Sequence, residues 1–79
     1  MPTVLNVNGF RFYFYSNENN EPVHLHGVKG NAEGKVWLEP EISIAYMHGF
    51  SNAAIKEIEK IIEINYITLK IKWYGYFSK

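Results

Sequence analysis

The stretch TVLNVNGFRFYF, residues 3–14, decides the fold because it contains two β-rich runs joined by a tight turn. Asn8-Gly9 is the dipeptide that best tolerates the positive φ angles of a type I′ turn, which joins neighbouring antiparallel strands. A two-residue loop also fixes the strand register. The predicted cross-strand pairs are Val7 with Phe10, Leu5 with Phe12, and Thr3 with Phe14.

The two faces of this hairpin differ in chemistry because side chains alternate along a strand. One face is apolar and is predicted to be core: Leu5, Val7, Phe10, Phe12 and Phe14. The opposite face is half polar and is expected to meet water or a ligand: Val4, Asn6, Arg11, Tyr13 and Tyr15.

Further strands are predicted at residues 23–28 and 32–39, with a short fifth strand at 41–46 after Pro40. Alternation places four apolar side chains toward the core: Val23, Leu25, Val36 and Leu38. The same parity puts four others together on the opposite side of the sheet, away from the helix-covered core and within reach of ligands: His24, His26, Lys35 and Trp37.

A long C-terminal helix is predicted to begin at Ser51, an N-cap residue that follows Gly49 and Phe50. Apolar residues then recur at spacings of three and four, which forms one stripe expected to lie on the sheet: Ile55, Ile58, Ile62, Tyr66, Leu69 and Trp73. More isoleucines are present than one sheet face needs, so Ile61, Ile64, Ile67 and Ile71 are core or dimer interface. The β-branched run leaves open fraying or a strand after Asn65.

The expected fold is therefore α+β: a small antiparallel sheet of four to five strands with one long C-terminal helix on one face, in a single domain over residues 1–79. Eight basic and eight acidic residues give zero formal net charge, so no global field attracts a polyanion. The absence of cysteine excludes disulfides and thiolate metal sites. No signal peptide or membrane span is evident, and a cytoplasmic location is expected.

The pair His24 and His26 is the candidate site, because residues i and i+2 of a strand carry neighbouring side chains on one face. Imidazoles there indicate acid/base chemistry, metal binding or anion recognition. A metal site would need His48, Glu33 or Glu39 as a further ligand, and this signal is weak, so no metal and no cofactor is predicted. The histidines can equally be structural, held by hydrogen bonds to glutamate or backbone.

A metal-independent ribonuclease would use the same face. The predicted catalytic residues are His24, His26 and Lys35, with one histidine taking the proton of a ribose hydroxyl while the second histidine or Lys35 stabilises charge on phosphorus. Substrate binding is assigned to Arg11 or Lys29 for the phosphate and to Tyr13 and Trp37 for stacking on a base.

The alternative is a non-enzymatic binding module, in which the aromatic and cationic sheet face receives a protein partner or a small anionic ligand. The C-terminal tail is dense in aromatic residues, which is typical of a self-association surface or of docking onto the sheet. A homodimer is predicted through an interface of Trp73, Tyr74, Tyr76 and Phe77.

Six sequence blocks together resemble a family of small bacterial proteins known only as a domain of unknown function: Met1-Pro2-Thr3-Val4, Asn8-Gly9-Phe10-Arg11-Phe12, Tyr15-Ser16-Asn17-Glu18, Glu21-Pro22-Val23-His24-Leu25-His26, Trp37-Leu38-Glu39-Pro40 and Gly49-Phe50-Ser51. The family's Pro-His-x-His motif appears here with Val23 in place of the second proline, and the C-terminal helix is richer in isoleucine. The resemblance implies a gene pair organised like a toxin and antitoxin, and hence a protein partner encoded by a neighbouring gene.

Overall fold

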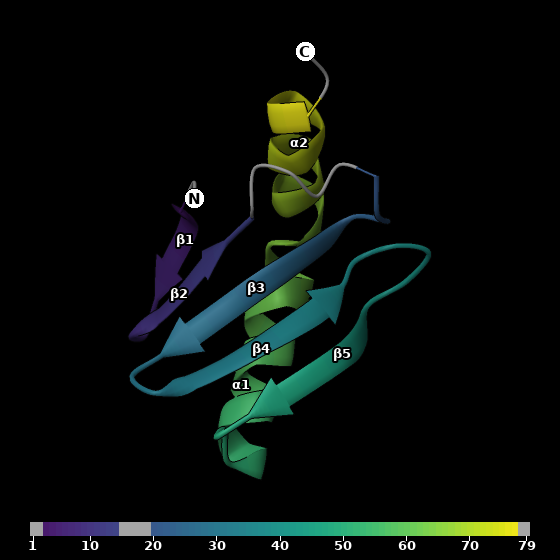
Figure 1. The fold of residues 1–79 in the computed structure, drawn as a ribbon. Coiled ribbons are helices and arrows are strands. Elements are labelled where there is room, and N and C mark those ends of the chain that lie inside the picture. Colours follow the sequence, from purple (N-terminus) through teal and green to yellow (C-terminus); the bar gives the residue numbers. More distant parts are fainter. Residues whose placement is uncertain (1–2, 15–19, 78–79) are drawn as a thin grey trace.

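In the computed structural model, which describes residues 3–14 and 20–77, five strands are followed by two helices (Figure 1). Each strand pairs antiparallel with the next, in the spatial order β1-β2-β3-β4-β5. The expected α+β class with an antiparallel sheet is confirmed. The elements are β1 (Thr3–Val7), β2 (Phe10–Tyr13), β3 (His24–Lys29), β4 (Ala32–Trp37), β5 (Ser43–His48), α1 (Asn52–Ile64) and α2 (Tyr66–Phe77).

The β1–β2 hairpin has the predicted turn, with φ angles of 53° at Asn8 and 84° at Gly9. The register pairs Val7 with Phe10 and Leu5 with Phe12, as predicted. The third predicted pair is wrong, since Thr3 pairs with Tyr13 and the register shifts between Thr3 and Leu5. Val4 lies in this irregular segment and packs against the core instead of facing away from it.

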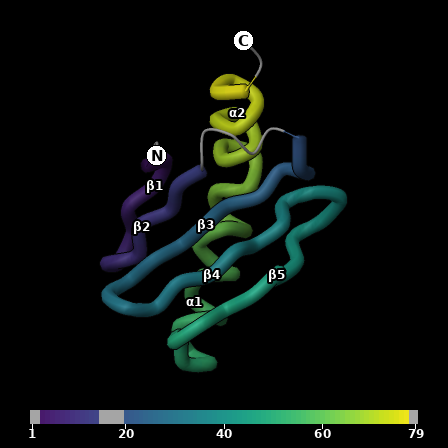
Figure 2. Tube along the Cα trace, viewed as in Figure 1, coloured from purple at the N-terminus to yellow at the C-terminus, as the bar shows by residue number. Residues whose placement is uncertain are grey.

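Both helices lie against one face of the sheet, so the fold has two layers (Figures 1 and 2). The hydrophobic core lies between the layers, and its side chains come from β2, β3 and β4 on one side and from both helices on the other. Among its fully buried members are Phe10, Phe12, Leu25, Ile58, Ile62 and Leu69. Burying each such side chain contributes about 1.5–3 kcal/mol, so the amphipathic faces hold the layers together.

The single long helix that the apolar spacing predicts is interrupted at one residue. Ser51 caps α1, accepting a hydrogen bond from the Ala54 backbone N–H at 3.1 Å. At Asn65 the backbone leaves helical geometry (φ −103°, ψ 14°), and the side-chain amide donates to the Ile61 carbonyl at 2.8 Å. An asparagine that bonds the backbone in this way competes with the regular helix.

The helical path resumes at once, because the Leu69 backbone N–H donates to the Asn65 carbonyl at 2.9 Å. Figure 2 shows α2 continuing from α1 as one column, and the strand considered after Asn65 is not formed. Burial of Leu69 and Trp73 explains why a β-branched run is helical here, since packing outweighs intrinsic propensity. Within the described ranges, neither helix is long and apolar enough to cross a membrane.

Candidate functional site

The strand register confirms the predicted grouping of side chains on the outer sheet face, the one turned away from the core. His24 pairs with Trp37, and His26 pairs with Lys35 on one side and with Tyr13 on the other. Because directly paired residues point to the same face, these five side chains are neighbours. The predicted catalytic residues and both predicted stacking residues, Tyr13 and Trp37, therefore lie together.

The expected accessibility to a ligand is wrong for the two histidines and Tyr13, whereas Lys35 and Trp37 are half-buried. His24 has no exposed surface, and His26 and Tyr13 are each 5% exposed. Aromatic rings surround His24, with ring centroids at 5.2 Å for His26, 5.4 Å for Trp37 and 4.9 Å for Trp73. Trp73 belongs to α2. The helix therefore helps to bury His24, although alternation along β3 assigns His24 to the outer face of the sheet.

His24 makes a hydrogen bond that fixes its protonation at one ring atom. Its Nδ1 lies 2.9 Å from the Pro22 carbonyl oxygen. Since a carbonyl oxygen can only accept, Nδ1 carries the proton and donates it. A Glu21 carboxylate oxygen lies 3.9 Å from the same nitrogen. These contacts tie the start of β3 to the segment before it, which is the structural role considered for this histidine.

The other polar side chains of the outer face have partners within the chain. Lys35 Nζ lies 2.9 Å from a Glu21 carboxylate oxygen and 4.3 Å from the centre of the Trp37 ring. The His26 ring stacks on Tyr13 at 5.5 Å with an angle of 18° between the planes. The Arg11 guanidinium lies 5.4 Å from the centre of the Tyr13 ring, which makes a cation–π contact. Arg11 itself is exposed.

Lys29 does not join this group, although it was predicted to bind the same phosphate. It follows His24 and His26 on β3 at an odd number of residues, so alternation directs it to the other face of the sheet. Its Nζ lies 4.7 Å from the centre of the Phe10 ring and donates to the Asn8 carbonyl at 3.3 Å. Lys29 therefore supports the hairpin turn.

The residues considered for a metal site, His24 and His48, do not lie together in the structure. His48 pairs with Glu33 near one end of β4, whereas His24 pairs with Trp37 at the other end. Over residues 3–14 and 20–77, no three His, Asp or Glu side chains form a group that could hold a metal ion.

The aromatic tail divides into buried and exposed residues. Trp73 is 4% exposed and packs edge-on against Phe14 with ring centroids 5.0 Å apart, so it belongs to the core. Tyr76 and Phe77 are half-buried and also contact the Phe14 ring. Of the four predicted interface residues, only Tyr74, at 49% exposure, remains largely accessible.

Tyr74 takes part in a polar cluster on the surface. Its hydroxyl donates to a Glu39 carboxylate oxygen at 2.6 Å, and Lys70 Nζ lies 3.2 Å from the same oxygen. The hydrogen bonds from Tyr74 and then from Lys70 hold the pKa of Glu39 below its usual range. The bond to Glu39 conversely raises the pKa of Tyr74 and of Lys70. This cluster links α2 to the end of β4.

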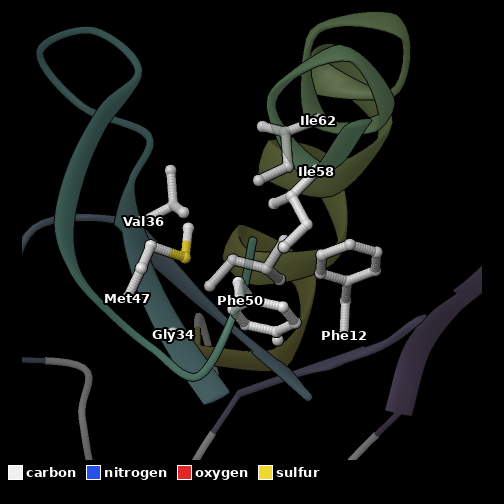
Figure 3. Close-up of a pocket in the computed structure, with 9 residues that line it drawn as sticks. Phe12, Gly34, Val36, Met47, Phe50, Ile58 and Ile62 are labelled. Atoms are coloured by element: carbon white, nitrogen blue, oxygen red, sulfur yellow. The ribbon is translucent and has the colours of Figure 1, made fainter. Parts of the chain in front are cut away.

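A hollow in the core lies on the inner side of the sheet, where two paired strands both carry glycine (Figure 3). It leaves no room for a water molecule and is lined almost entirely by apolar side chains, with Met47 and Phe50 beside Gly34 and with Ile58 and Ile62 from α1. The signal in the sequence is a glycine in the middle of each strand, at Gly27 and Gly34. The hollow lacks polar groups that would orient a ligand and is packing space.

We expect Gly34→Ala to lower the free energy of unfolding by about 1–3 kcal/mol, because an added methyl group overfills this part of the core. Its Cβ would collide with Met47 Sδ and lie 3.1 Å from the Tyr46 carbonyl oxygen. Gly75→Ala is the matched control, since a Cβ at that helical position meets nothing within 4 Å. It should stabilise the fold by about 0.5–1 kcal/mol. Urea unfolding of both variants measures the difference, and equal effects would contradict the packing argument.

Comparison with known proteins finds one family. Residues 9–74 match the family described as a domain of unknown function (DUF4160). No curated protein matches the chain, and no solved structure matches it. The match supports the expected membership of a small domain-of-unknown-function family.

Proposed function

Since the chain belongs to the DUF4160 family, whose description assigns no activity, we propose a function from the geometry: a non-enzymatic interaction module that binds a protein partner. The observation that carries this proposal is the exposure of β5, the strand at one edge of the sheet. Five of its six residues are exposed. Because β5 ends the strand order, an extended segment of another chain could be added to the sheet beside it.

The chemistry of β5 supports strand addition. Natural edge strands are commonly blunted by lysine, proline or other charges, and Ser43 to Met47 contain none of these. Ile44 is 41% exposed and Tyr46 is 36% exposed, which gives a partner apolar side chains to cover. The opposite edge differs, because Lys72 Nζ donates to the Val4 carbonyl of β1 at 3.1 Å.

The burial of the histidines favours binding over catalysis. A general acid or base must lie within hydrogen-bond reach of the substrate proton it transfers. His24 has no exposed surface and donates from Nδ1 to Pro22, and Lys35 is paired with Glu21. A ribonuclease using His24, His26 and Lys35 would have to open this cluster before RNA could reach it.

The identity of the partner follows from the family resemblance, which implies a gene pair organised like a toxin and antitoxin. We assign the partner to the neighbouring gene and place its contact on β5. In this proposal the chain regulates that partner by binding, and it neither cleaves RNA nor recruits an anion. The neutral net charge supports the choice, because binding of a polyanion relies on counterion release at basic surfaces.

The test is the affinity of the purified neighbouring gene product for the wild-type chain and for Ile44→Lys, measured by calorimetry. A lysine in place of Ile44 on β5 should weaken binding about tenfold or more, because its charged ammonium group must be desolvated when a strand is added. Ile67→Lys is the matched control, making the same change at an exposed isoleucine of α2, and should bind like wild type. Equal affinity of Ile44→Lys, or RNA cleavage by the wild-type chain, would contradict the proposal.

A further inference from the structure

The helical column carries an apolar stripe on its exposed side, and the last residue of the stripe, Tyr74, borders the end of β4 through its bond to Glu39. Ile64, Ile67, Ile71 and Tyr74 are 75%, 66%, 65% and 49% exposed. They follow one another at spacings of three, four and three residues, so they form a continuous row along the end of α1 and most of α2. This spacing is the a and d pattern with which helices pack together in coiled coils.

The stripe exposes a large apolar area for so small a chain. With ordinary side-chain areas, these four residues expose on the order of 500 Å², near the upper end of the roughly 300–600 Å² typical of a monomer's largest patch. Two such stripes facing each other would bury about 1,000 Å² in total, which reaches the lower bound for a specific interface. Neighbouring side chains would add to this area.

We propose that the stripe is a homodimer interface, in which a second copy of the chain packs its own stripe against it in antiparallel orientation. The two-fold axis would pass between Ile67 and Ile71. Each Ile67 then faces Ile71 of the second copy, and each Ile64 faces Tyr74 of the second copy. A two-fold arrangement uses the same patch on both subunits, as the commonest homodimers do.

Charge selects the antiparallel arrangement over the parallel one. Toward the N-terminus the same spacing continues with Lys60 and Glu57, both exposed, and the Glu57 carboxylate accepts a hydrogen bond from the Asn8 side-chain amide at 2.9 Å. A parallel pair in register would place each of these charges opposite its own copy, which is repulsive. The antiparallel pair brings the apolar parts together and leaves both charges beyond the end of the partner's α2, with Glu57 still bonded to Asn8 and Lys60 exposed.

This surface is separate from the one assigned to the neighbouring gene product, because the stripe lies on the helices and β5 lies at the sheet edge. It also differs from the aromatic tail first predicted as the interface, with which it shares only Tyr74. Dimerisation through the stripe leaves β5 accessible, and a dimer would present two copies of that edge.

The first experiment measures mass by sedimentation equilibrium from about 1 to 300 μM, a range that spans the weak affinities typical of small interfaces. The wild-type chain should shift from 9.2 kDa toward twice that mass as concentration rises. Ile67→Lys should stay monomeric, and its circular dichroism should match wild type because the side chain is already exposed. Ile44→Lys serves as the control on the other surface and should still dimerise. A monomeric wild-type chain, or an unchanged Ile67→Lys dimer, would overturn the proposal.

The second experiment tests the orientation and uses the absence of native cysteine. Ile64→Cys and Tyr74→Cys, mixed and oxidised, should form a disulfide-linked pair containing one chain of each variant. Ile64→Cys alone should not crosslink, because the two positions would lie about 15 Å apart along the helix axis, at 1.5 Å per residue. A disulfide requires Cα atoms within about 7 Å. Efficient crosslinking of Ile64→Cys alone would overturn the antiparallel arrangement.

Discussion

Replacing Trp73 with alanine is expected to lower the free energy of unfolding by about 3–5 kcal/mol, the usual cost of removing a buried tryptophan. The side chain is 4% exposed and occupies the centre of an aromatic cluster. Its ring centroid lies 4.3 Å from that of Phe77, 4.9 Å from that of His24 and 5.0 Å from that of Phe14. Alanine leaves a cavity at the point where α2 meets the sheet.

Because a small domain has a total stability of only about 5 kcal/mol or somewhat more, Trp73→Ala is expected to be largely unfolded at 37 °C. Trp73→Phe keeps part of the packing and should lose about 1–3 kcal/mol, within the range that urea unfolding resolves. Thr68→Ala, an exposed change on the same helix, is the control and should alter stability by no more than about 0.5 kcal/mol. If Trp73→Ala kept wild-type stability but no longer self-associated, Trp73 would be an interface residue and not part of the core.

The face on which each histidine lies could be predicted from sequence, but its exposure could not. Alternation along β3 and β4 correctly grouped His24, His26, Lys35 and Trp37, since parity is a local property of strands. Burial of His24 depends in part on Trp73, which lies far along the chain and reaches it only because of where α2 crosses the sheet. No local pattern contains that information.

The same rule separates Lys29 from the histidines, because Lys29 follows His26 by three positions on one strand and must face the other side. The break at Asn65 is harder to predict, since an asparagine within an apolar helical spacing is compatible with a regular helix. At the break, the Asn65 side-chain amide and its backbone N–H both donate to the Ile61 carbonyl. The number of isoleucines in the helix correctly indicated more apolar surface than the sheet can cover. Which of them are buried depends on packing against the sheet, since Ile61 is 6% exposed and Ile64 is 75% exposed.

Replacing His24 with alanine is expected to destabilise the fold by about 2–4 kcal/mol, through loss of buried contacts and of a buried hydrogen bond. The ring is fully buried between Trp37 and Trp73, and its Nδ1–H donates to the Pro22 carbonyl. A catalytic histidine at the surface would behave in the opposite way, with activity lost and stability kept. Thermal and urea unfolding therefore distinguish a structural histidine from a catalytic one without an activity assay.

The conservative variant His24→Asn separates the two contributions. The asparagine amide can donate near the position of Nδ1, so the bond to Pro22 can be kept while most of the ring packing is lost. We expect His24→Asn to be more stable than His24→Ala by about 0.5–1.5 kcal/mol, the net contribution of one hydrogen bond. His48→Ala is the control, because that histidine is exposed on β5 and its loss should change stability by no more than about 0.5 kcal/mol. Equal stability of His24→Ala and His48→Ala would show that the buried aromatic cluster does not hold the start of β3. A catalytic role for His24 would then explain the histidine pair better than a structural one.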